Sequence, residues 1–323
     1  MVEITELKGD IWQVDLEERG EPGSTAGYFI KGDRDWMLLE TGPASSAENI
    51  LEAAARIGIA HQQVKHMGVT HIHIDHAGGL GTMCCYFSEA KLWVHPRGIK
   101  HMIDPTRLIA GSRAAHGEKK MQQFGEILPV PENRLTPALD GCNIHLGDRV
   151  LEVWETPGHA RHHVCFYDTI TRGLFSGDEA GVYFPRLSKL LNRPVLRPST
   201  PAPDFDGALM QQSLNRLALY ELEAIYYTHF GAAAPAQFLL ELVIGQLSIQ
   251  MHMAKTYQAE QDALQKLGIA VRQQLAQGLG LPTARAGEKL DQRLGNEIDL
   301  LLEPSQNSAA GLLVSLNKNN NLH

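Results

Sequence analysis

Short apolar runs alternate with helical patterns over the first two thirds of the chain. Residues 27–30 and 36–40 are apolar runs on either side of a turn at 31–33, which predicts a β-hairpin. A further apolar run, 66–69, leads directly into a cluster of polar residues. These runs predict the first strands of an α/β fold.

A helix is predicted between these strands, from Ser45 or Ser46 to Arg56. Glu48 stands three residues after Ser45, as in a capping box, and Gly58 stands where a helix would end. We therefore expect a serine hydroxyl to cap this helix.

The middle of the chain predicts more strands and one long loop. Residues 105–124 have a mostly helical pattern, and a second helix is predicted at 207–219. Residues 183–205 hold five prolines and little periodicity, which predicts a long loop. The strands predicted here are 92–95, 150–155, 164–167, 174–176 and 224–227.

The pattern changes after Pro235. Apolar residues recur at helical spacing from Leu239 to Ala254, which predicts an all-helical appendage. A last helix is predicted at 288–302, and the Asn-rich tail 317–323 is predicted to be mobile.

Charge and composition narrow the class of protein. The 323 residues include 29 Lys and Arg against 37 Asp and Glu, a net charge of -8. An acidic balance of this size carries no electrostatic footprint for nucleic acid or an anionic membrane, so we expect neither as a partner. No apolar run is as long as the about 18 residues that a membrane span needs. The first residues lack the pattern of a secretion signal. We therefore expect a soluble, cytoplasmic protein.

The four cysteines do not form a recognisable pattern. Cys84 and Cys85 are adjacent, and Cys142 and Cys165 stand alone. This spacing fits neither a disulfide framework nor a CxxC zinc site, so buried thiols are expected.

Histidine is the unusual part of the composition, with 15 residues. The segment THIHIDHAGG places His71, His73, Asp75 and His76 within six positions at the end of a predicted strand. In an extended segment His71, His73 and Asp75 would share one face, and the following turn would bring His76 round. Three imidazoles and a carboxylate this close would be costly in a core without a cation, so a metal site is predicted.

Three later segments each add one candidate metal ligand. In each of them an apolar strand leads into a histidine or an aspartate: these residues are His159, Asp178 and His229. Taken singly, such a residue is more often structural. Four strands that all end in this way favour a common metal site.

HxHxDH followed by single His, Asp and His positions in this order resembles the signature of the metallo-β-lactamase superfamily. The resemblance covers roughly residues 4–234 and implies a four-layer αββα sandwich, here with a C-terminal helical extension. The runs 177–182, 196–206 and 228–231 are similar to a prokaryotic branch of metal-dependent hydrolases close to the glyoxalase II and lactonase relatives.

The resemblance implies two divalent metal ions. His71, His73 and His159 would hold the first ion, Asp75, His76 and His229 the second, and Asp178 would bridge them. Zinc is the default, and iron and manganese suit the same ligands. The chain departs from the family in its LxDxG segment, where it has Glu40 instead of aspartate. Glu40 would still orient a metal-bound histidine, with altered geometry.

The resemblance also implies a hydrolase that attacks an ester, thioester or lactone carbonyl. A hydroxide shared by two ions about 3.5–4 Å apart would be the nucleophile, and Asp75 would take and return a proton. Tyr183 is a candidate donor to the oxyanion, with a packing tyrosine as the alternative. His163 matches the second histidine of the family's TPGHxxxH pattern, where it would support the site. His95 and His162 are expected to be ordinary surface or core histidines.

Several questions stay open at this level. Arg186, Arg193 and Arg197 could pair with a substrate anion or simply be solvated. Alternative functions are a phosphodiesterase, a mononuclear iron dioxygenase that would use His71, His159 and Asp178, and a metal-retaining binding or regulatory protein with vestigial activity.

The predicted domains are a catalytic domain, 1–235, and the helical appendage, 236–323. The appendage would pack on its own domain, act as a lid or form a homodimer interface. We expect a small or medium acyl substrate.

Overall fold

The computed structural model describes residues 1–279, 297–299, 301–302 and 305–320. The chain forms two compact units that interleave along the sequence. Unit 1 comprises Met1–Glu155, His162–Gly177 and Tyr226–Ala232, and unit 2 comprises Thr156–Arg161, Asp178–Ile225 and the described part of Ala233–His323. The domain boundary at residue 235 stays a prediction, because these units are groups of packed segments and not consecutive halves of the chain.

The first sheet of unit 1 combines antiparallel and parallel pairing. It runs antiparallel from β1 to β4 and parallel from β4 to β7. In spatial order the strands are β1 (Ile4–Leu7), β2 (Ile11–Asp15), β3 (Ala26–Lys31), β4 (Trp36–Leu39), β5 (Val64–Gly68), β6 (Lys91–Val94) and β7 (Leu135–Pro137). The predicted hairpin is confirmed as β3 and β4, and the run 66–69 begins on β5.

The second sheet contains four of the five strands predicted in the middle of the chain, and the fifth, 92–95, corresponds to β6 of the first sheet. Neighbouring strands from β8 to β11 pair antiparallel. In spatial order the strands are β15 (Gly231–Ala233), β14 (Ala224–Tyr227), β11 (Gly173–Gly177), β10 (Val164–Asp168), β9 (Arg149–Glu155) and β8 (Asn143–Leu146). The four predictions that fall on β9, β10, β11 and β14 are confirmed.

Large side chains join the two sheets face to face. The ring of Tyr28 on β3 lies 5.1 Å from Phe175 on β11 and 5.9 Å from Tyr226 on β14. The approach is so close at Gly68 that an added Cβ would lie 3.1 Å from the ring of Phe166 on β10. Burial of these aromatic surfaces stabilises the sandwich.

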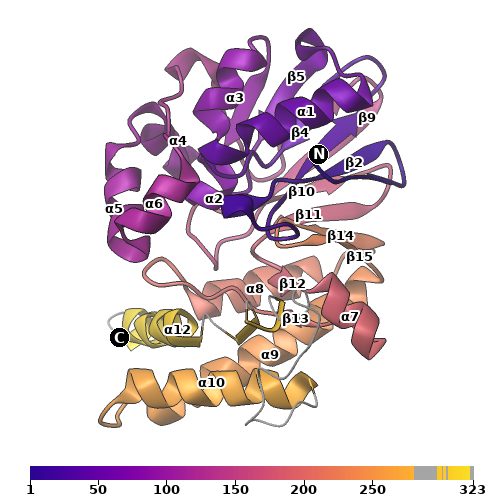
Figure 1. The fold of residues 1–323 in the computed structure, drawn as a ribbon. Coiled ribbons are helices and arrows are strands. Elements are labelled where there is room, and N and C mark those ends of the chain that lie inside the picture. Colours follow the sequence, from indigo (N-terminus) through magenta and orange to yellow (C-terminus); the bar gives the residue numbers. More distant parts are fainter. Residues whose placement is uncertain (280–296, 300, 303–304, 321–323) are drawn as a thin grey trace. The chain divides into compact units, whose positions relative to one another are not determined.

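Helices cover the outer face of the first sheet (Figure 1). α1 (Ala47–Ile57) buries Ile50, Ala53 and Ala54 in a core cluster that also contains Phe29 and Leu38 of the sheet. The other helices of unit 1 are α2 (Ile74–Ala77), α3 (Leu80–Tyr86), α4 (Pro96–Ile103), α5 (Thr106–His116) and α6 (Glu118–Phe124). α5 and α6 confirm the helical pattern predicted for 105–124.

The predicted serine cap of α1 is wrong. Ser46 is the residue before the helix, but its hydroxyl donates to the carbonyl of Leu16 at 2.8 Å and makes no bond to the helix. The same carbonyl accepts a bond from the Asn49 amide at 3.1 Å. A tertiary contact has therefore taken the hydroxyl that the local pattern assigned to capping.

The thiols are partly as expected. Cys84 and Cys165 are buried, whereas Cys142 is half-buried and Cys85 is exposed on α3. Burial raises the pKa of the Cys84 thiol. The expectation of a buried thiol is therefore wrong for Cys85.

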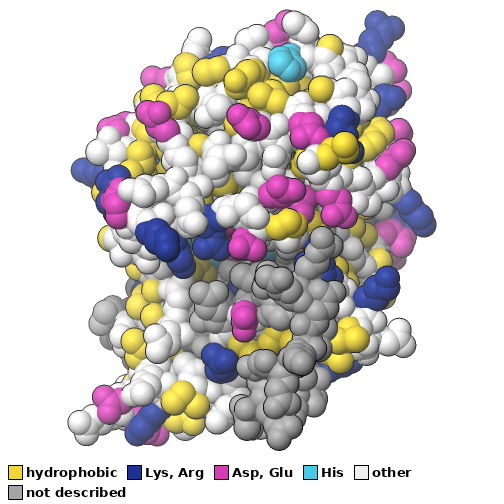
Figure 2. Space-filling model, viewed as in Figure 1, with side chains coloured by type: hydrophobic (Ala, Val, Ile, Leu, Met, Phe, Trp, Pro, Cys, Tyr) yellow, Lys and Arg dark blue, Asp and Glu magenta, His cyan; other side chains and the backbone are white. Residues whose placement is uncertain are grey.

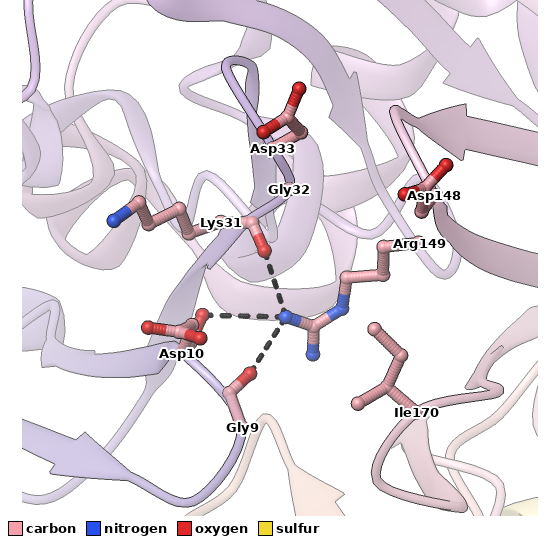
Figure 3. A pocket seen from close by; sticks show the side chains of 8 residues that line it. All are labelled: Gly9, Asp10, Lys31, Gly32, Asp33, Asp148, Arg149 and Ile170. Carbon is pink, nitrogen blue, oxygen red and sulfur yellow. Dashed lines mark hydrogen bonds between the residues drawn. The ribbon is translucent and has the colours of Figure 1, made fainter.

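Arg149 holds together several turns of unit 1 (Figure 3). Its guanidinium donates to the carbonyl of Gly9, in the turn between β1 and β2, at 2.7 Å and to that of Lys31, the last residue of β3, at 2.9 Å. It also forms a bidentate pair with Asp168 at the end of β10, at 2.9 and 2.7 Å. Arg149 and Asp168 are both buried and lie on neighbouring strands of the second sheet, so the ion pair holds the guanidinium in place while its bonds to Gly9 and Lys31 connect it to the first sheet.

Unit 2 is mainly helical. Its elements are β12 (Val182–Tyr183), α7 (Pro185–Leu191), β13 (Leu196–Arg197), α8 (Gly207–Leu217), α9 (Ala236–Tyr257), α10 (Ala263–Leu279) and α12 (Ser305–Asn320). The predicted loop 183–205 therefore contains a helix and a short antiparallel strand pair. Its prolines misled the prediction because Pro185 occupies the first turn of α7, where a helix tolerates proline.

The predicted appendage is helical in its described part. Leu239, Val243 and Leu247 of α9 are buried, which confirms the apolar stripe. α10 packs against both α9 and α12. α12 extends through Asn320, where a mobile tail was expected; 321–323 lie outside the described residues. Most of the predicted helix 288–302 also lies outside them, and 297–299 and 301–302 are helical.

Two surface properties complete the description. Among the described residues on the face in Figure 2, acidic and basic side chains are interspersed. No helix in the described ranges has the length and apolar character needed to cross a membrane.

Candidate metal centre

The segment that carries HxHxDH leaves the first sheet at the end of β5 and enters a short helix. His71 and His73 lie in the connection, and Asp75 and His76 lie on α2. The expected extended alternation is therefore wrong. Contacts with the segment after β4 set this shape, because Thr41 donates both its N–H and its hydroxyl to the carbonyl of His76, each at 3.0 Å.

Unit 1 brings Asp75, His76 and His229 together. One potential ligand atom from each of the three lies within 4.8 Å of the other two. Oδ2 of Asp75 is 3.5 Å from Nε2 of His229 and 4.0 Å from Nε2 of His76. His76 is fully buried, while the Asp75 side chain keeps 30% of its exposure. A carboxylate open to solvent beside one buried and one half-buried imidazole is suited to hold a divalent cation.

The far nitrogen of each imidazole in this group has a fixed partner. Nδ1 of His76 lies 2.7 Å from Oε2 of Glu40, and Nδ1 of His229 lies 2.8 Å from the carbonyl of Ser24. Oxygen acceptors at these positions favour a proton on Nδ1, which presents Nε2 to Asp75. Glu40 thus contacts a histidine of this group, as expected, and metal binding by His76 stays a prediction.

The position of Glu40 is fixed by its burial, its backbone conformation and a second hydrogen bond. It is buried, its backbone is left-handed at φ 65°, and its Oε1 accepts the Thr70 N–H at 2.7 Å. A non-glycine residue in this region of φ is uncommon and marks a conformation imposed by its surroundings. One carboxylate therefore fixes both the start of the HxHxDH segment and its last histidine.

His71 and His73 form a second imidazole group in unit 1. Nε2 of His71 lies 2.9 Å from Nδ1 of His73, and the ring of His71 is 4.0 Å from that of His76. The fully buried ring of His163 stacks on His71 at 5.0 Å, which agrees with a supporting role. His162 is also near, with its ring 6.1 Å from that of His71.

His95 has the structural surroundings that we expected. It is buried, its Nδ1 accepts the Arg97 N–H at 3.1 Å, and its Nε2 lies 3.1 Å from Glu155.

Unit 2 contains His159 and Asp178 in contact with each other. Nε2 of His159 lies 3.4 Å from Oδ2 of Asp178, and both side chains are buried. The N–H of His159 donates to the buried carboxyl of Glu179 at 3.2 Å. Burial raises the pKa of Glu179 well above its usual range, and the neighbouring Asp178 raises it further. Sequence patterns gave no signal for Glu179.

The other predicted site residues of unit 2 have varied surroundings. Tyr183 is half-buried on β12. The guanidinium of Arg186 lies 4.0 Å from Glu297, that of Arg193 donates to the carbonyl of Gly278, and that of Arg197 donates to the carbonyl of Pro198 at 3.2 Å. All three arginines thus have partners within their own unit.

Two packed sheets whose strands lead into imidazoles and carboxylates define an α/β sandwich protein with potential metal ligands. The chain belongs to the metallo-beta-lactamase superfamily, whose family model matches residues 20–229. The predicted family and fold class are therefore confirmed.

Three relatives show sequence identities below 30% to this chain. The chain is 28% identical over 220 residues, 64% of its length and 73% of the relative's, to the metallo-beta-lactamase fold-containing protein ST1585 of Sulfurisphaera tokodaii. It is 27% identical to the acyl-coenzyme A thioesterase MBLAC2 of Bos taurus, over 49% of this chain and 59% of the relative. It is 29% identical to a hydroxyacylglutathione hydrolase of Maricaulis maris, over 70% of each chain.

Solved structures agree on the fold. The crystal structure of ST1585 matches with a TM-score of 0.61 at 19% identity, covering 90% of this chain and 93% of that one. A metallo-beta-lactamase family protein from Thermus thermophilus matches with a TM-score of 0.62 at 19% identity, covering 92% and 89%.

Proposed function

We propose that the chain is a dinuclear metal-dependent hydrolase of an acyl ester, thioester or lactone. The observation that carries the proposal is the group of Asp75, His76 and His229, in which both imidazoles have their far nitrogens bound and their Nε2 atoms near one carboxylate. That arrangement is how proteins prepare histidines for a metal ion.

A thioester is the favoured substrate class among the three. Two of the relatives reported above are named for thioester hydrolysis, an acyl-coenzyme A thioesterase and a hydroxyacylglutathione hydrolase. Both are distant, and the match spans 59% of the first and 70% of the second, so their activity supports the proposal as an analogy.

The residues present fit a pair of divalent cations by their chemistry. His71, His73 and His159 would hold one ion, Asp75, His76 and His229 would hold the other, and Asp178 would contact both. Imidazole and carboxylate ligands suit zinc, iron and manganese, with zinc the default. When bound, such a pair lowers the pKa of water toward about 7 and polarises a carbonyl group.

The chain's own groups account for proton handling and orientation. Asp75 has the most exposed side chain of its group, so its carboxylate is the one best able to accept a proton from water and return it to the leaving group. Glu40 keeps the imidazole of His76 in one tautomer and one direction. In unit 2, Tyr183 would donate its phenol proton to the oxygen of the cleaved carbonyl.

The test is hydrolysis by the full-length protein after reconstitution with zinc. The panel is an acyl-coenzyme A, a hydroxyacylglutathione, an acyl-homoserine lactone, p-nitrophenyl acetate and bis-p-nitrophenyl phosphate. We expect the thioesters to have the highest kcat/KM. A preference for the phosphodiester over every acyl substrate would contradict the proposal.

Two variants make the test specific to the site. His76→Ala should lower kcat/KM more than about 100-fold, since even partners of metal-bound histidines cost about 10–100-fold. The control is His145→Ala, because His145 is exposed on β8. Equal activity of the two variants would contradict the assignment of His76.

A further inference from the structure

We propose that Ser199 is a positioning residue of the metal centre, which locks His159 and Asp178 together, and that helix α12 holds its segment in place. The inference rests on the proposed function, which takes His159 and Asp178 as metal ligands. It adds a residue from the proline-rich segment and the last described helix of the chain to the machinery of the site.

Ser199 contacts both ligands with two different groups. Its hydroxyl donates to Oδ2 of Asp178 at 2.8 Å, and its carbonyl lies 3.1 Å from Nδ1 of His159. A carbonyl only accepts, so Nδ1 of His159 must carry the proton, and Nε2 keeps its lone pair. Nε2 is also the atom that lies 3.4 Å from Asp178. One residue thus selects the tautomer of the imidazole and the rotamer of the carboxylate.

The segment after Ser199 is fixed by α12 along its length. The ammonium group of Lys318 donates to the carbonyls of Pro203, Asp204 and Phe205 at 2.8, 3.2 and 3.1 Å. Nearer the start of the segment, Gly311 approaches Thr200 so closely that a Cβ would lie 2.1 Å from the Thr200 carbonyl oxygen. A helix more than a hundred residues further along the chain therefore constrains the backbone next to Ser199.

α12 is also connected to the far end of this segment. The N–H of Gly207 donates to the hydroxyl of Ser315 at 2.8 Å. Because Gly207 begins α8, the segment 199–207 is fixed at both ends and in its middle. We infer that it behaves as a rigid strap across the two ligands and not as a solvated loop.

Ser188 provides a matched control inside the same unit. Ser188 and Ser199 are both 8% exposed. The Ser188 hydroxyl donates to the Phe184 carbonyl at 2.6 Å and accepts the Val195 N–H at 2.9 Å, so its partners are backbone groups of its own segment. Loss of this hydroxyl measures the general cost of removing a buried serine.

The experiment is Co²⁺ titration of the metal-free, full-length protein, followed by its visible spectrum and by competition with a chelator. Ser199→Ala should bind Co²⁺ about 10–100-fold more weakly and alter the ligand-field bands, as expected when an outer partner of a ligand is lost. Ser199→Thr keeps the hydroxyl and should recover most of the affinity. Ser188→Ala should lose stability and keep wild-type affinity.

Other outcomes separate the two proposals. If the wild type binds Co²⁺ and Ser199→Ala behaves like Ser188→Ala, the role of Ser199 is wrong and the proposed function stands. If the wild type binds no Co²⁺ and cleaves no acyl substrate, the proposed function itself fails. Lys318→Met tests α12 without touching Ser199: a smaller loss of Co²⁺ affinity is expected, and unchanged affinity would remove α12 from the account.

Discussion

Replacement of Arg149 by methionine should destabilise unit 1 without a change in its surface. The substitution keeps an unbranched side chain of similar length and removes the charge that pairs with Asp168. Arg149 is 3% exposed and Asp168 is fully buried, so the remaining carboxylate would be an uncompensated buried charge. Breaking such a pair costs about 3–5 kcal/mol.

The structure places the expected loss toward the lower part of that range. Asp168 would keep bonds from the N–H groups of Ile170 and Thr171, at 3.4 and 3.1 Å, and from the Thr171 hydroxyl. Against this, the carbonyls of Gly9 and Lys31 would lose their donor. We therefore expect a loss of about 3 kcal/mol in the free energy of unfolding.

Tryptophan fluorescence during a urea titration reports the unfolding of unit 1, where the loss is expected. The four tryptophans, Trp12, Trp36, Trp93 and Trp154, all belong to unit 1. The control is Arg34→Met, since Arg34 is 91% exposed and its contact with Asp33 is a surface pair. A change below about 1 kcal/mol in Arg149→Met would refute the view that Arg149, held by Asp168, connects the two sheets.

Two further predictions concern Glu40 and Asp15. Glu40→Gln should weaken Co²⁺ binding about 10–100-fold, because the carboxylate partner of His76 is lost. The control is Glu48→Gln on exposed Glu48, which should keep wild-type affinity. Equal affinities of the two variants would contradict the role of Glu40. Burial raises the pKa of Asp15 from 3.8 to about 6, so its contribution to stability is fully present below pH 3.8 and is lost as the pH rises through 6. In the metal-free protein this contribution to the free energy of unfolding is about 3 kcal/mol. Asp15→Asn should remove the pH dependence measured in urea titrations between pH 4.5 and 7, and an unchanged pH profile would refute the role of Asp15.

The strands and the ligand types could be predicted because their signals are local. The apolar runs that became β9, β10, β11 and β14 end at Gly or polar residues, and the histidines and aspartates that follow them stand out in the sequence. The order of these residues also gave the family. Periodicity and composition were sufficient wherever the structure depends on neighbours in the sequence.

Three of the failures involve distant contacts. Ser45 or Ser46 was predicted to cap α1, but the hydroxyl of Ser46, which precedes the helix, bonds to Leu16, 30 residues earlier. The HxHxDH segment was predicted to be extended, but contacts from Glu40 and Thr41 bend it into α2. Ser199 was not predicted at all, because its partners Asp178 and His159 stand 21 and 40 residues away with no periodic signal.

The number of divalent ions bound by the full-length protein tests the central claim most directly. Metal analysis after saturation with zinc and removal of the excess should give two ions per chain for the wild type. His229→Ala and His159→Ala should each retain about one, since the proposed function assigns them to different ions, and Asp178→Ala should lose metal from both proposed positions. A wild type that retains no zinc, or variants that retain as much as the wild type, would contradict the account.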